Sequence, residues 1–133
     1  MHVKDGMSSV VLTIGPDVTL REAARQMAKR NVGAAVVVDP DSQGPGIITE
    51  RDVLKAVAEG EDAAGERVCE HLTEELIVAA PDWSLEQAAE AMLDGGFRHL
   101  IVVDGADLVG VLSMRDIVRC WTKQGAATAD ASA

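Results

Sequence analysis

The segment Gly-Ile-Ile-Thr-Glu-Arg-Asp at residues 46–52 returns in altered form as Gly-Val-Leu-Ser-Met-Arg-Asp at residues 110–116. Each copy starts as a short apolar run with β-branched residues, which favours a strand. The run then continues through Thr or Ser to an acidic residue three positions later, which is the spacing of a capping box at a helix start. We therefore predict a junction between a strand and a helix in each copy.

The similarity between the two halves extends well beyond these junctions. A shift of 65 residues aligns Pro16-Asp17 with Pro81-Asp82, and Val37-Val38-Asp39 with Val102-Val103-Asp104; one deletion then changes the shift to 64. Self-similarity along most of a chain indicates two copies of one structural unit. We predict three parts: repeat 1 at residues 1–62, repeat 2 at residues 63–123, and a disordered tail at residues 124–133.

Within each repeat, hydrophobic periodicity predicts the order strand, helix, strand, strand, helix. Thr19 and Ser84 each begin a capping-box pattern, and the apolar residues after them follow the i, i+3, i+4, i+7 spacing of a helix packed on one side. The segments Asn31-Val32-Gly33 and Gly95-Gly96 are expected to close these helices, with Gly33 in a left-handed conformation. The second helices are expected at residues 50–58 and 114–122, each after a strand pair, with short helical segments leading into each repeat.

A repeat of this size buries too little surface to be stable alone, so the two repeats should pack together. We predict an α+β fold with α/β layering. In it, two three-stranded sheets pack face to face about an approximate two-fold axis, and clefts form where strand ends and helix starts of the two repeats meet.

Composition excludes several classes of function. The chain has 133 residues and a net charge of −10, too short for a large multidomain enzyme and too acidic for a nucleic-acid-binding protein. No apolar run is long enough for a membrane span and no leader peptide is evident, so a cytoplasmic protein is expected. The two cysteines, Cys69 and Cys120, are expected to be free.

The junctions support two interpretations that are compatible with each other. The structural interpretation is that Asp52 and Asp116 cap helices. The functional interpretation is that a helix N-terminus binds a phosphate, to which a hydroxyl donates and an arginine, Arg51 or Arg115, pairs. In that case the aspartate would accept hydrogen bonds from the two adjacent hydroxyls of a ribose.

The two junctions in register, together with Val-Lys-Asp-Gly-Met at 3–7 and Val-Cys-Glu-His-Leu at 68–72, make the chain resemble the cystathionine-beta-synthase (CBS) domain family. The resemblance covers nearly all of residues 1 to 123 and is to the paired form, the Bateman module. It implies binding of an adenosine ligand between the repeats. The residues implied to contact that ligand are Ile14, Val18, Thr49, Arg51, Asp52, Ala79, Trp83, Arg98, His99, Ser113, Arg115 and Asp116.

The resemblance also implies a role for each group. Asp52 and Asp116 would hold ribose hydroxyls, and Thr49 and Ser113 would hold ribose or phosphate. The backbone at Ile14 and Ala79 would read the adenine edge, with Val18 and Trp83 in reach of the ring.

The basic pair Arg98-His99 would meet phosphates, whereas the matching positions of repeat 1 hold Gly33-Ala34. The two clefts are therefore expected to differ in charge. The structural alternatives are a solvated Arg98, a partly buried His99, and Trp83 in plain packing.

The function expected from the resemblance is regulatory, not enzymatic. The ligand would be AMP, ADP or ATP, with NAD or S-adenosylmethionine as alternatives, and no resident cofactor is expected. The partners would be a second copy of the chain, in a homodimer, and an unknown effector protein. Other hypotheses are a dimerisation module without ligand and a small nucleotide-processing enzyme, although no acid, base and nucleophile set is found. The segment Cys69-Glu70-His71 does not have the paired spacing of a zinc site, so no metal site is expected.

Overall fold

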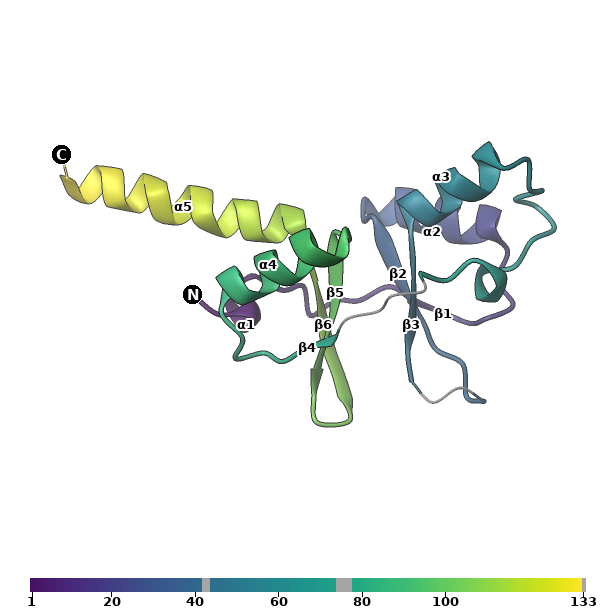
Figure 1. The fold of residues 1–133 in the computed structure, drawn as a ribbon, viewed down its shortest axis with the longest axis horizontal. Coiled ribbons are helices and arrows are strands. Elements are labelled where there is room, and N and C mark those ends of the chain that lie inside the picture. Colours follow the sequence, from purple (N-terminus) through teal and green to yellow (C-terminus); the bar gives the residue numbers. More distant parts are fainter. Residues whose placement is uncertain (42–43, 74–77, 133) are drawn as a thin grey trace. The chain divides into compact units, whose positions relative to one another are not determined.

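The computed structural model describes residues 1–41, 44–73 and 78–132, shown as a ribbon in Figure 1. The chain forms two compact units. One is Val11–Leu76, and the other combines Met1–Val10 with Ile77–Ala133. The first ten residues thus belong to the unit that contains most of repeat 2.

The unit Val11–Leu76 has one small mixed sheet covered by helices. Its elements are β1 (Thr13–Ile14), α2 (Leu20–Arg30), β2 (Ala34–Val37), β3 (Gly46–Thr49), α3 (Glu50–Ala58) and a 3-10 turn, η1 (Val68–Glu70). The sheet order is β1-β2-β3. β1 and β2 are parallel because α2 returns the chain across the sheet, whereas β2 and β3 are antiparallel.

The second unit repeats this architecture. Its elements are α1 (Val3–Gly6), β4 (Val78–Ala79), α4 (Leu85–Gly95), β5 (His99–Asp104), β6 (Asp107–Ser113) and α5 (Met114–Ser132). The sheet order is β4-β5-β6, again with one parallel and one antiparallel pair. The predicted order of elements and the two three-stranded sheets are confirmed.

Each unit has its own hydrophobic core. One core contains Leu20, Ala23, Met27, Val37 and Ile48, so the apolar stripe predicted for α2 does face the sheet. The corresponding core of the other unit contains Leu85, Ala88, Met92, Leu100 and Leu112. Burial of the helix stripe against the sheet is what holds each layer together.

The short segments that begin the two repeats, α1 in repeat 1 and η1 in repeat 2, each lie in the compact unit that holds most of the other repeat. The Val3 amide donates to the Trp83 carbonyl at 2.8 Å, and the Val68 amide donates to the Val18 carbonyl at the same distance. Each repeat's lead-in thus completes the compact unit that holds the other repeat's first helix. The pattern of residues along the chain does not reveal this exchange, because it depends on pairings between distant segments.

Three local predictions differ from the structure. Asn31, not Gly33, takes the left-handed conformation that ends α2, with φ of 54°. Asn tolerates this region because its short polar side chain can bond locally. Only half of the capping box predicted at the start of α2 is formed. The Thr19 hydroxyl accepts from the Glu22 amide, but the Glu22 carboxylate accepts from Gln26 and Arg25 instead of from the Thr19 amide. α5 continues to Ser132, past Thr122, in a tail whose alanines favour helix.

Both cysteines are free, Cys69 at the surface and Cys120 in the core. In the part of the chain that the structure describes, no helix combines the length and apolar character needed to cross a bilayer.

Candidate functional site

The first junction lies where β3 meets α3, in the unit Val11–Leu76. The Thr49 hydroxyl accepts from the Asp52 amide at 3.2 Å, and Oδ2 of Asp52 accepts from the Thr49 amide at 2.8 Å, which completes the predicted capping box. The same Oδ2 also accepts from the hydroxyls of Thr49 at 2.8 Å and Thr73 at 2.6 Å. Within the described ranges, Oδ1 of Asp52 has no hydrogen-bond donor, so one carboxylate oxygen remains for a ligand hydroxyl.

The second junction lies where β6 meets α5, in the other unit. Oδ2 of Asp116 accepts from the Ser113 amide at 2.8 Å, and the Asp116 amide donates to the Ser113 hydroxyl at 3.1 Å. Asp116 is 9% exposed, the one charged residue in the core among those described. Its Oδ1 binds Arg119 at 2.9 Å, one turn further along α5. The capping interpretation is therefore confirmed at both junctions, and ribose binding by these aspartates stays a prediction.

The backbone at these helix starts leaves few free donors. The amides of Glu50 and Met114, the first helical residues, donate to the carbonyls of Gly33 and Arg98. Among the residues that the structure describes, the Arg115 amide at the second position of α5 has no acceptor. An unsatisfied amide at a helix N-terminus is a donor suited to a phosphate oxygen.

The basic pair Arg98-His99 and its counterpart Gly33-Ala34 occupy equivalent backbone positions in the two units. His99 pairs with Ser113 across β5 and β6, as Ala34 pairs with Thr49 across β2 and β3. Arg98 is exposed, and its carbonyl holds the start of α5. The structure therefore places the Arg98-His99 backbone at the second junction, where repeat 1 has Gly33-Ala34. Arg51 and Arg115 are exposed on the first turns of α3 and α5.

The four remaining candidate residues lie at the first strands and the turns that follow them. Ile14 and Ala79 are buried at the ends of β1 and β4. The Ile14 carbonyl accepts from the Val38 amide at 3.0 Å, so one of its two lone pairs already serves the sheet. Val18 and Trp83 are partly buried against the two cores, so part of each side chain serves packing.

Two residues that contact the aspartates were missed in the sequence. Arg119 could have been found from its i, i+3 spacing to Asp116 on one helix face. Thr73 lies 21 residues from Asp52, and the only sequence signal was the hydroxyl residue Ser8 at the matching position 65 residues earlier.

Comparisons with known proteins agree with this architecture. The family model described as "CBS domain" matches residues 2–59 and 68–122, so the chain belongs to the CBS domain family and is a tandem pair, a Bateman module. The chain is 39% identical over 118 residues to the CBS domain-containing protein YhcV of Bacillus subtilis, covering 86% of this chain and 81% of YhcV. It spans smaller shares of other curated relatives, such as 66% of a 17.7 kDa protein of Acidianus ambivalens.

Two similar solved structures contain adenosine compounds. The CBS domain protein PAE2072 of Pyrobaculum aerophilum, in complex with AMP, is 31% identical and superposes with a TM-score of 0.78, covering 87% of this chain and 89% of that one. The CBS domain pair of protein MJ0100, in complex with 5-methylthioadenosine and S-adenosyl-L-methionine, is 28% identical with a TM-score of 0.82, covering 93% and 98%.

Proposed function

We propose that this chain is a regulatory module that binds an adenosine ligand, with AMP, ADP or ATP as the first candidates. The observation that carries the proposal is the repeated junction, in which a capping aspartate and a hydroxyl residue lie at the start of a helix in both units. The ligands of two similar structures, AMP and S-adenosyl-L-methionine, support the adenosine class.

The chemistry of the junctions suits a nucleotide. At the first junction, Asp52 has an open carboxylate oxygen that suits a ribose hydroxyl. At the second junction, considered by itself, the Arg115 amide and the exposed Arg98 and Arg115 side chains suit a phosphate. The net charge of −10 would oppose a polyphosphate at long range, so local cations and amides must hold it.

A thermal-shift panel tests this function. AMP, ADP, ATP, NAD and S-adenosylmethionine are added to the full chain, with GMP as a control of equal charge to AMP. A ligand at a hundredfold excess over its Kd stabilises the folded state by roughly 2.7 kcal/mol, which raises Tm clearly. If no adenosine compound raises Tm, or GMP raises it as much as AMP, the proposal fails.

A second candidate function, a dimerisation module without ligand, rests on exposed apolar side chains of α3 and α5. Leu54 is 68% and Val57 54% exposed on α3, while Val118 is 52% and Trp121 43% exposed on α5. Two other apolar residues of these helices, Ile117 of α5 and Val53 of α3, pack into the cores instead. Exposed apolar side chains on a helix favour association, and we propose that a second copy of the chain covers those of each helix.

Light scattering at micromolar concentration tests the dimer. Wild-type protein should give twice the 14.0 kDa mass of one chain, and Leu54→Glu or Trp121→Glu should shift it toward the monomer. Leu93→Glu is the matched control, because Leu93 is 72% exposed on a different helix, α4. A wild-type mass of one chain contradicts the dimer.

The enzyme hypothesis has a simple test of its own. The purified chain is incubated with ATP or AMP and the mixture is examined for products. We expect the nucleotides to remain unchanged, and turnover that copurifies with the chain would favour the enzyme hypothesis over a regulatory module.

A further inference from the structure

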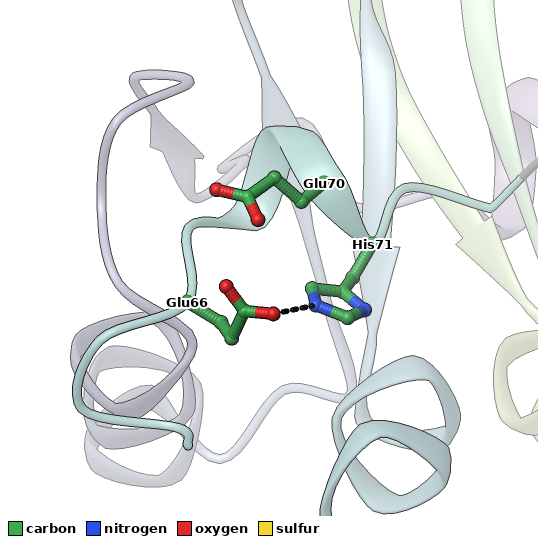
Figure 2. Close-up of side chains that lie close together, drawn as sticks. All are labelled: Glu66, Glu70 and His71. Atoms are coloured by element: carbon green, nitrogen blue, oxygen red, sulfur yellow. Dashed lines mark ion pairs between the residues drawn. The ribbon is translucent and has the colours of Figure 1, made fainter. Parts of the chain in front are cut away.

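Three potential metal ligands meet beside η1. Figure 2 shows Glu66, Glu70 and His71 with their side chains turned toward one another. One donor atom from each lies within 4.8 Å of the other two. All three belong to the unit Val11–Leu76 and come from one short segment, so the cluster does not depend on the other unit.

The imidazole of His71 has an unsatisfied nitrogen in this cluster. Its Nε2 is buried and has no hydrogen-bond partner among the described residues. The nearest carboxylate oxygen, Oε1 of Glu66, lies 3.6 Å away, beyond the ordinary range of a hydrogen bond. Two ligands bound at about 2.1 Å to a tetrahedral ion are about 3.4 Å apart, close to the observed separation.

The carboxylates are crowded in a way that a cation would relieve. A carboxylate oxygen of Glu66 and one of Glu70 lie within 4.8 Å of each other, so two like charges face each other in the cluster. The guanidinium of Arg67 donates to the Glu70 carboxylate at 3.1 Å. The Arg67 guanidinium also pairs with Asp17 at 3.0 Å, so its positive charge is divided between Glu70 and Asp17.

The backbone around the cluster is held in place. The Glu66 carbonyl accepts from the Leu20 amide at 2.9 Å, and the Glu66 amide donates to Asp62 at 2.8 Å. The His71 amide donates to the Val68 carbonyl at 3.0 Å. Ligands on a fixed backbone lose less conformational entropy when they bind an ion.

We propose that Glu66, Glu70 and His71 bind one divalent transition-metal ion of the zinc class. An imidazole with two carboxylates suits Zn²⁺, whereas Mg²⁺ prefers oxygen ligands only. Water would complete the coordination. The ion would connect Glu66, which precedes η1, to Glu70 and His71 at the end of η1. This connection would stabilise the unit Val11–Leu76 independently of the proposed adenosine site.

The described residues of the other unit do not form such a cluster. The positions 65 residues before the three ligands hold Met1, Asp5 and Gly6, which offer one carboxylate and no imidazole. The proposal therefore predicts one ion for each chain, not two.

Titration calorimetry with ZnCl2 on the full chain, freed of metal by a chelator, tests the site. We expect one Zn²⁺ for each chain, and a loss of affinity of at least about tenfold in His71→Gln and in Glu66→Gln. His2→Gln and Cys69→Ser are matched controls that remove another imidazole and the exposed thiol, and they should keep the wild-type affinity. MgCl2 should bind at least about tenfold more weakly than ZnCl2.

Three results with ZnCl2 would overturn the proposal. They are the absence of Zn²⁺ binding at millimolar concentration, wild-type affinity in both cluster variants, and a loss of binding confined to the His2 or Cys69 control. Equal binding of Mg²⁺ would also overturn it, because His71 would then not be a ligand.

Circular dichroism in EDTA checks that each variant is folded. If His71→Gln is unfolded, Glu66→Gln, which removes a crowded carboxylate, decides the question alone.

Discussion

The hydroxyl of Thr73 lies 2.6 Å from Oδ2 of Asp52 and connects the segment after η1 to the first turn of α3. In the other unit the matching residue, Ser8, donates instead to the Val10 carbonyl, and Asp116 is held by Arg119. The two capping aspartates are thus fixed by different neighbours, although their capping boxes are the same.

Replacement of Thr73 by valine should destabilise the protein. The change keeps the size of the side chain and removes a hydrogen bond to a charged carboxylate, which contributes about 1.5–3 kcal/mol. Urea unfolding measures the loss. The control is Ser8→Ala, whose exposed hydroxyl bonds a neutral carbonyl and should change the free energy of unfolding by less than about 0.5 kcal/mol. Equal effects of the two variants would contradict the assigned role of Thr73.

The glycine that begins each junction segment permits a close approach of another segment of the chain. A Cβ on Gly110 would lie 2.7 Å from the Ser8 carbonyl oxygen, whereas a Cβ on Gly46 would meet the side chain of Leu72 at 2.9 Å. A backbone atom cannot move aside as a leucine methyl can. Gly110→Ala should therefore cost about 1–3 kcal/mol of unfolding free energy, and Gly46→Ala less. A larger loss at Gly46, measured by the same urea titration, would show that the packing differs.

Substitution of Arg98 should affect ligands according to their phosphates. We expect Arg98→Ala to weaken ATP and ADP more than adenosine, and to reduce the dependence of binding on salt, because one cation near the phosphates is lost. Calorimetry at two salt concentrations measures both effects. Arg25→Ala is the control, since Arg25 is exposed and pairs with Glu22 on its own helix. An equal loss for adenosine and ATP would show that Arg98 does not meet phosphates.

The sequence predicted the elements of each repeat because their signals are local. Helix caps at Thr19, Ser84, Thr49 and Ser113 are formed by residues three positions apart, and the β-branched runs before them are short strands. The prediction that both aspartates cap helices was confirmed for the same reason.

The features that the sequence did not predict depend on distant contacts. The exchange of the lead-in segments follows from the pairings of Val3 with Trp83 and Val68 with Val18. Thr73, which donates to Asp52, lies 21 residues away from it. Spacing along the chain carries no direct information on such contacts.

The most direct test of the proposed function is calorimetry of AMP, ATP and adenine with wild-type protein, Asp52→Asn and Asp116→Asn. If the aspartates hold ribose, AMP and ATP should bind the wild type, and the variants should bind them more weakly by roughly 1.5–3 kcal/mol, with adenine much less affected. Each variant should also lose about 0.5–2 kcal/mol of unfolding free energy through its weaker cap. Unchanged nucleotide affinity in both variants, with only the loss of stability, would contradict the account and leave the aspartates as helix caps.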